Sequence, residues 1–173
     1  YEIFDENIAC DIRLNDALEH NLIVPFHYFG ISDIKSIDYE NVDLTKIDVL
    51  AKLLSVNKRV DYIIEQMNFY SFVGNKRKAI GFCVSKEHGI YMSEEFNKRG
   101  INSTFLSSED SILNRVNFIE KLEDDTDSLE VIFTVDIFNE GVDIPSINTV
   151  LFLRPTNSPI VFIQQLGRGL RKY

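Results

Sequence analysis

The sequence contains no tryptophan, two cysteines (Cys10 and Cys83) and three histidines among its 173 residues. No C-x-x-C pair and no Cys/His spacing of the kind that binds zinc occurs, so no metal site is predicted. Two isolated cysteines indicate a reduced protein of the cytoplasm. No apolar run approaches the ~20 residues of a membrane span, and no signal-peptide pattern is visible, so we expect no membrane partner.

Positive charge is also scarce. Lys and Arg together number 18 against 27 Asp and Glu, which gives a formal net charge of −9. A general nucleic-acid coat protein is normally basic, so this class is excluded, whereas a local basic site is not. The 45% hydrophobic content suffices for the core of one domain. Because the chain starts at Tyr1 rather than Met, we expect a piece of a longer protein.

Strands and helices alternate in the second half of the chain. Ser85 is a good N-cap for a helix that Gly100 is expected to end, and Ser107 with Asp110 predicts a capping box for the next helix. Such alternation is typical of an α/β fold in which helices cover both faces of a parallel sheet and functional groups gather at the carboxyl ends of the strands. Strands are predicted over residues 24–31, 79–84, 102–106, 130–135 and 149–154, and helices over 15–20, 48–54, 58–70, 85–98 and 107–122, with a short turn or helix at 137–139 and a final helix from 159 onwards.

The last residues carry a Gln-x-x-Gly-Arg-x-x-Arg pattern. On a helix, Gln164, Arg168 and Arg171 fall at i, i+4 and i+7 and therefore share one face. A planar guanidinium is well suited to gripping phosphate oxygens, and no Asp or Glu between Pro155 and Tyr173 neutralises these arginines. A solvated or ion-paired helix face is the alternative interpretation.

A second group of candidate residues follows the strand that ends near Thr134. The Thr134 hydroxyl could hold an anionic backbone, Gly141 could supply a positive φ or a close backbone approach, and Asp143 could accept from a ribose hydroxyl. Ordinary turn chemistry is the alternative for each residue. No G-x-x-x-x-G-K-[ST] pattern occurs, so the chain has arginines suited to binding phosphate but no P-loop of its own. This combination suits a domain that completes the ATP site of another domain.

Three segments, in this order, resemble helicase motifs. Residues 79–88 (AIGFCVSKEH) resemble motif IV, residues 134–145 (TVDIFNEGVDIP) resemble motif V, and residues 164–171 (QQLGRGLR) resemble motif VI. With them, residues 79–173 resemble the second RecA-like domain of superfamily 2 helicases. The residues of these motifs most resemble those of bacterial DEAD/DEAH-type helicases akin to restriction-enzyme motors and excision-repair helicases. Residues 17–31 (ALEHNLIVPFHYFGI) resemble the start of this domain in that group.

The resemblance implies a nucleotide site shared between two domains. Arg168 and Arg171 would act as arginine fingers on the γ-phosphate of ATP, which the first RecA-like domain would hold together with Mg²⁺. Gln164 would lie near the same cleft. The residues that would couple the nucleotide to the domain interface are Glu140, Gly141 and Asp143.

The resemblance also implies nucleic-acid contacts and a domain organisation. Thr134, Ser85 and Lys86 would contact the phosphate backbone of a tracked strand, with DNA as the expected partner. Residues 1–75 would form a leading segment with an edge strand and helices, and residues 76–173 the helicase C-terminal RecA-like domain, with the first RecA-like domain absent from this chain.

The expected function is that of the second motor domain of an ATP-dependent DNA helicase or translocase, inactive when isolated. One alternative is a non-catalytic helicase-like scaffold or regulatory module. Another is an unrelated flavodoxin-like α/β domain, for which the loop 85–89 is the candidate anion-binding turn.

Overall fold

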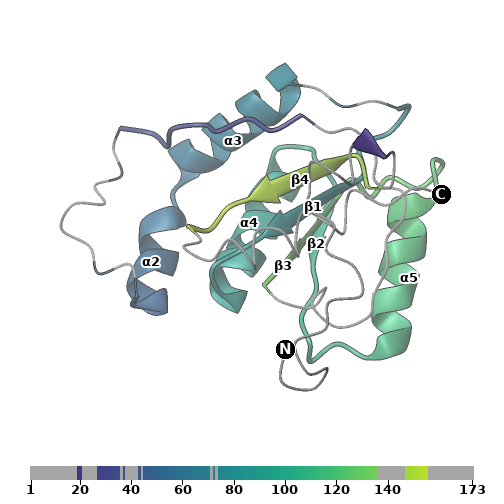
Figure 1. Ribbon diagram of the computed structural model, residues 1–173. Helices are drawn as coiled ribbons and strands as arrows, with labels where there is room; N and C mark the ends of the chain where they lie inside the picture. Colours follow the sequence, from purple (N-terminus) through teal and green to yellow (C-terminus); the bar gives the residue numbers. More distant parts are fainter. Residues whose placement is uncertain are drawn as a thin grey trace, which may run out of the picture.

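The fold is that of a computed structural model, which describes residues 19–20, 27–35, 37, 43, 45–70, 72, 74–135 and 147–155. Within these residues, four parallel strands form one sheet in the order β2-β3-β1-β4 (Figure 1). The strands are β1 (Ala79–Phe82), β2 (Ser103–Phe105), β3 (Val131–Thr134) and β4 (Thr149–Phe152), and the helices are α2 (Ile47–Leu54), α3 (Asn57–Tyr70), α4 (Lys86–Lys98) and α5 (Ile112–Glu123).

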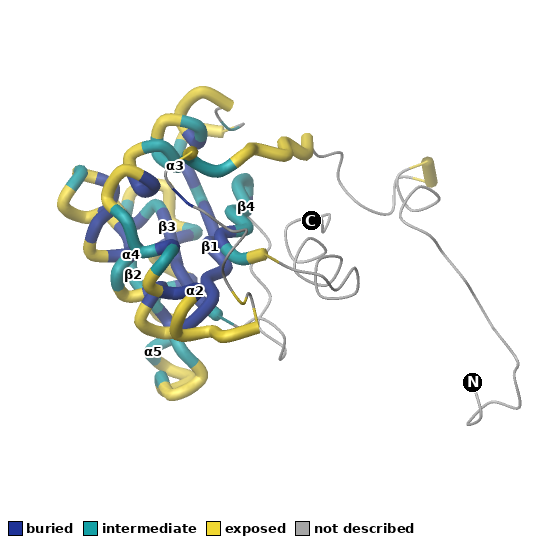
Figure 2. The backbone as a smooth tube through the Cα atoms, turned by 90° about the vertical axis from the view of Figure 1, so that its left-hand side faces the viewer, coloured by how far each residue is buried: buried dark blue, intermediate teal, exposed yellow. Residues whose placement is uncertain are grey.

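The strands form where the sequence has short apolar runs. β1 and β3 lie in the middle of the described sheet, and every residue of both is buried (Figure 2), as expected for parallel strands covered on both faces. Phe82 at the end of β1 pairs in register with Thr134 of β3 and with Phe152 of β4. The four strands predicted in the second half are confirmed, each shorter than predicted by one or two residues at an end.

Alternate strand residues face two different cores. Ala79 and Cys83 contribute to a core with α3 and α4, whereas Ile80 and Phe82 contribute to a second core with α5. Helices therefore cover both faces of the sheet (Figure 1), which confirms the predicted α/β architecture.

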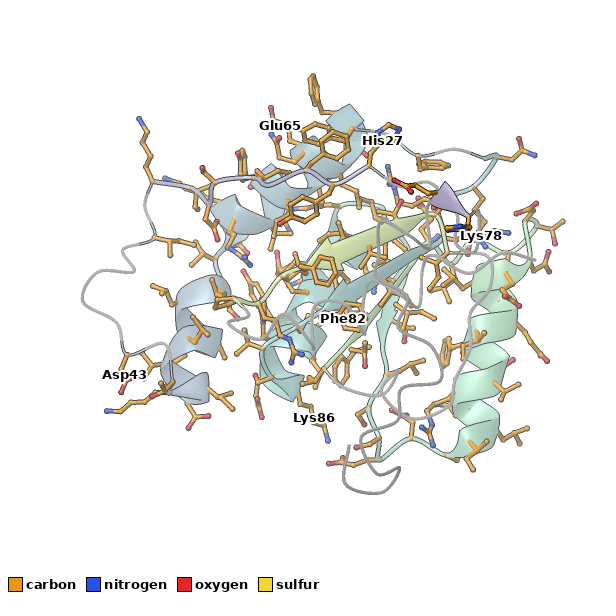
Figure 3. The ribbon with its side chains drawn as sticks, viewed as in Figure 1. His27, Asp43, Glu65, Lys78, Phe82 and Lys86 are labelled. Carbon is orange, nitrogen blue, oxygen red and sulfur yellow. The ribbon has the colours of Figure 1, made fainter. Side chains whose placement is uncertain are left out.

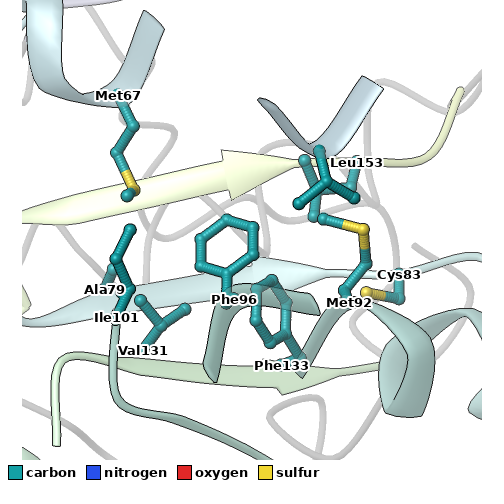
Figure 4. Close-up of a cluster of buried hydrophobic side chains, with 10 residues drawn as sticks. Met67, Ala79, Cys83, Met92, Phe96, Ile101, Val131, Phe133 and Leu153 are labelled. Atoms are coloured by element: carbon teal, nitrogen blue, oxygen red, sulfur yellow. The ribbon is translucent and has the colours of Figure 1, made fainter. Parts of the chain in front are cut away.

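The core beneath α3 and α4 is closely packed around two aromatic rings. Phe96 of α4 meets Phe133 of β3 edge to face, with ring centroids 4.9 Å apart (Figure 4). A Cβ on Gly81 of β1 would stand 2.5 Å from the Phe133 ring. The glycine in the middle of the strand thus makes room for this ring.

Helix α4 begins and ends at the predicted residues. The Ser85 side chain caps its N-terminus by accepting from the backbone N–H of His88 over 3.2 Å. At the other end Gly100 has φ +80°, and the N–H of Ile101 donates to the carbonyl of Phe96 over 3.0 Å. This is the Schellman arrangement, which favours glycine because of the left-handed backbone.

Helix α5 corrects one prediction. Its N-cap is Ser111, which accepts from the N–H of Asn114 over 3.2 Å, and not Ser107. The predicted capping pair instead closes the preceding turn, because the N–H of Ser107 donates to the Asp110 carboxylate over 2.7 Å. Because the Asp110 carboxylate closes this turn, Ser111, four residues after Ser107, caps the helix instead.

The basic cluster before β1 caps the far end of α5. The Lys76 ammonium donates to the carbonyls of Lys121 and Asp124 over 3.0 and 2.7 Å, and the Lys78 ammonium donates to the carbonyl of Glu123 over 2.7 Å. Cations at the C-terminal end of a helix interact favourably with its dipole.

The first part of the chain shows one clear success and one correction. α2 and α3 confirm the predicted helices 48–54 and 58–70, each beginning one residue earlier. The described residues 27–31 of the strand predicted over 24–31 form no strand; they lie against α3, where Phe29 stacks on Tyr70 with ring centroids 3.9 Å apart. Of the helix predicted over 15–20, only Glu19 and His20 are described.

Candidate functional site

The carboxyl ends of the central strands lie side by side. The N–H of Cys83 donates to the carbonyl of Thr134 over 2.7 Å, and the N–H of Leu153 donates to the carbonyl of Phe82 over 3.0 Å. The chain therefore leaves β1, β3 and β4 at one edge of the sheet, as parallel pairing predicts. We define the carboxyl edge as residues 83–88, 134 and 153–154.

Ser85 stands where β1 passes into α4. Its side-chain oxygen accepts from the backbone of His88, and its one hydroxyl hydrogen serves the Glu87 carboxylate, so a bound anion would have to compete with Glu87 for this donor. The first N–H groups of a helix also favour negative charge. This tendency is visible at Glu87, whose pKa is lowered by backbone hydrogen bonding and by the Ser85 hydroxyl.

Lys86 is the first residue of α4 (Figure 3), and its side chain is about half exposed. Its ammonium forms an ion pair with the carboxylate of Glu109, 23 residues away. The hydrogen bond with Glu109 raises the pKa of Lys86. A phosphate that binds Lys86 would therefore compete with a carboxylate from the loop after β2.

Thr134 ends β3 and is fully buried. Its carbonyl accepts from Cys83, but its hydroxyl finds no hydrogen-bond partner among the residues that the structure describes. An unsatisfied buried hydroxyl calls for a physical explanation. A hydroxyl at this position could serve a backbone group or a ligand oxygen.

His88 has a structural role in this geometry. Its ring is buried, and Nδ1 accepts from the N–H of Val84 over 3.3 Å. Burial, assisted by the charge of Arg59, lowers the pKa of His88 to about 4, so the ring is neutral at pH 7. Burial likewise raises the pKa of the Cys83 thiol, which marks this cysteine as an inert core residue.

Arg59 is a site residue that the sequence reasoning missed. It lies in the first turn of α3 and is only 7% exposed. Its Nε donates to the Asp33 carboxylate over 2.8 Å, and its Nη2 donates to the carbonyl of Leu153 over 3.5 Å. The available signal was spacing: Arg59 stands four and eight residues before Ile63 and Met67, on the apolar face of the helix.

The structure thus brings Ser85, Lys86 and Thr134 to one edge of the sheet. The other predicted site residues lie outside the described part of the chain: Glu140, Gly141, Asp143, Gln164, Arg168 and Arg171.

Neither a metal-binding cluster nor a membrane-spanning helix occurs among the described residues. No group of three or more His, Cys, Asp or Glu side chains within the described ranges could hold a metal ion. In the same part of the chain, no helix has the length and apolar character needed to cross a membrane.

Comparison with protein families matches the chain to the helicase conserved C-terminal domain over residues 45–173. The chain is 30% identical over 171 residues to IRC3 of Saccharomyces cerevisiae, named as a candidate ATP-dependent helicase, and 26% identical over 133 residues to UvrABC system protein B of Chlorobium phaeobacteroides. These alignments cover 98% and 72% of this chain but 23% and 18% of the relatives. The chain therefore spans about a quarter or less of these relatives.

Among solved structures, the chain is similar to a fragment described as a candidate HsdR subunit of a type I restriction enzyme from Vibrio vulnificus. The superposition has a TM-score of 0.58 at 21% identity and covers 78% of this chain and 27% of that one. At this identity the likeness shows the fold, a RecA-like parallel α/β sheet.

Proposed function

This chain belongs to the helicase conserved C-terminal domain family, whose model matches residues 45–173, and we propose that it is the second motor domain of an ATP-dependent DNA helicase or translocase. The family match carries the proposal. The parallel sheet supports it, because motif IV and the start of motif V stand together at the carboxyl edge. In this proposal a first RecA-like domain lies elsewhere in a longer protein.

Arg168 and Arg171 would be the groups of this chain that act on the nucleotide. ATP, bound with Mg²⁺ mainly by the first domain, supplies the phosphoanhydride bond that is hydrolysed. A guanidinium presents a planar fork to phosphate oxygens and stabilises the charge that develops on them in the transition state. Gln164 would lie near the same cleft, and coupling to the domain interface would fall to Glu140, Gly141 and Asp143.

Ser85, Lys86 and Thr134 would contact the nucleic-acid backbone. The capped start of α4 favours anions, Lys86 adds a cation, and the Thr134 hydroxyl is unsatisfied among the described residues. Contacts of this kind are to phosphates and are therefore largely independent of sequence. We propose DNA rather than RNA because the residues of the motifs resemble those of restriction-enzyme motors.

The direct test measures DNA-stimulated ATP hydrolysis by the full-length protein beside the isolated 173-residue chain. Hydrolysis by the full-length protein alone is the expected result. Arg171→Ala in the full-length protein should lower kcat by roughly 10³-fold or more, because an arginine finger acts in the transition state. Lys172→Ala, which removes the neighbouring charge outside the motif, is the matched control and should retain activity.

Two outcomes would contradict the proposal at different levels. Unchanged turnover in Arg171→Ala would remove the arginine-finger assignment and leave the family intact. Absence of hydrolysis by both proteins, with circular dichroism showing both to be folded, would favour the non-catalytic scaffold.

A further inference from the structure

Arg59 is a buried charge in an unfavourable position. Its side chain is 8% exposed, although arginine is seldom buried unless it is paired. It also stands in the first turn of α3, where no acidic residue accompanies it and where the helix dipole disfavours cations. The contacts of Arg59 must offset both costs.

These contacts connect segments far apart in the sequence. Asp33, 26 residues earlier, accepts from Nε over 2.8 Å through Oδ2, while its Oδ1 accepts from the N–H of Ile34 over 2.9 Å. Leu153, 94 residues later, accepts from Nη2 through its backbone carbonyl. One guanidinium thus joins the segment before α2 to the point where the chain leaves β4.

The segment around Asp33 also packs against the carboxyl edge. Ile34 and Ile37 form a small apolar cluster with α2 residues and with Val84, which directly precedes Ser85. Arg59 itself acts electrostatically on Cys83 and His88. Its Nη1 finds no acceptor among the described residues, so the fold described here does not fully satisfy the guanidinium.

We propose that Arg59 is a positioning residue: it holds the segment around Asp33 against Leu153 and thereby sets where the arginines after β4 stand relative to the nucleotide. The inference rests on the proposed function, in which the chain before Asp33 comes from the first motor domain and the chain after Leu153 leads to Arg168 and Arg171. Arg59 would then tie the connection between the domains to the exit that carries the arginine fingers.

The experiment compares Arg59→Lys and Asp33→Asn with the wild-type full-length protein. Lysine keeps the charge but cannot serve Asp33 and Leu153 together as the guanidinium fork does. Both variants should lower kcat for DNA-stimulated hydrolysis roughly 10- to 100-fold, because small misplacements of a catalytic group cost that much. The KM for ATP should stay within about twofold, since the lost interaction belongs to the transition state.

Arg99→Lys is the matched control. Arg99 bridges α3 and α4 through Asp61 and Glu95, with each ion pair at 2.5 Å, so its loss perturbs α3, the helix that carries Arg59, without removing a contact to Asp33 or Leu153. Assays run well below the melting temperature of every variant separate folding from turnover. Normal kcat in Arg59→Lys, or an equal loss of kcat in Arg99→Lys, would overturn the positioning role.

A double-mutant cycle separates this inference from the proposed function. If Arg59 acts through the arginine fingers, Arg59→Lys should change single-turnover hydrolysis little when Arg171→Ala is already present. Full additivity of the two changes would refute the inference while leaving Arg171 as a finger. Unchanged hydrolysis in Arg171→Ala alone would instead remove the arginine-finger assignment on which the inference rests, and absence of hydrolysis by the folded full-length wild type would refute the proposed function.

Discussion

Acidification should destabilise this chain through His88. The ring lies in the core at the start of α4 and accepts a hydrogen bond from Val84 through Nδ1. Protonation would break this bond and place a second positive charge near Arg59. The folded state therefore disfavours the protonated ring, and the pKa of His88 falls from 6.5 to about 4.

The size of the effect follows from proton linkage. Between these two pKa values the unfolded chain binds more protons than the folded one, so stability is fully present above pH 6.5 and is lost as the pH falls toward 4. From about pH 7.5 to about pH 5.5 the loss is roughly 1 kcal/mol, and below about pH 4 it levels off at roughly 3 kcal/mol. The pH range from about 7.5 to about 5.5 lies above the range in which ordinary carboxylates titrate, so the loss there can be assigned to His88.

The assay is urea unfolding of the wild-type chain and of His88→Gln at both pH values. Glutamine stays neutral, and its side-chain oxygen can accept from the N–H of Val84. We expect the variant to lose about 1 kcal/mol less than the wild type between about pH 7.5 and about pH 5.5, with equal m-values. An equal loss in both proteins would refute the assignment of this acid sensitivity to His88.

Two further predictions concern the same edge of the sheet. Gly89→Ala should destabilise the chain by about 1–3 kcal/mol because the new Cβ would collide with the Phe105 ring. The loss should appear as a lower urea midpoint even though alanine normally favours a helix. A gain in stability would contradict this packing. Lys86→Ala should reduce the salt dependence of DNA binding by about one phosphate contact, and Glu109→Gln should strengthen DNA binding because it releases the Lys86 ammonium. Fluorescence anisotropy over a salt series measures both effects. Identical salt slopes for the wild type and the two variants would remove Lys86 from the interface.

Local chemistry in the sequence predicted much of this fold. Ser85 and Gly100 act within one turn of α4, so their side-chain and backbone preferences alone indicate where the helix starts and stops. The apolar runs of β1 and β3 indicate strands for a similar reason. The carboxyl edge then follows, because parallel strands bring the loop after Phe82 and the loop after Thr134 together.

The errors have two causes: a competing local hydrogen bond at one helix start, and distant contacts elsewhere. Ser107 and Asp110 have the sequence of a capping box, yet Asp110 closes a turn and the cap passes to Ser111. Residues 27–31 have the composition of a strand but lie against α3 instead of joining the sheet. Arg59 was missed because a charged residue in a first turn is expected to be exposed; its spacing places it on the apolar face of α3, but its partners, which account for its burial, lie 26 and 94 residues away.

Charge placement, rather than charge count, is what makes an acidic chain compatible with nucleic-acid binding. The run Lys76–Lys78 is the densest basic stretch before β1, yet Lys76 and Lys78 donate to the C-terminal carbonyls of α5, and Arg77 is held by Asn68 and Glu130. These cations serve the fold at the amino ends of the strands. At the opposite edge, Lys86 stands at the anion-favouring start of α4 with a side chain about half exposed. A phosphate approaching the carboxyl edge would meet that cation and the helix terminus together, while the net charge of −9 repels nucleic acid from the rest of the surface. Reversing the charge at Lys86 should therefore weaken DNA binding far more than reversing it at Lys76.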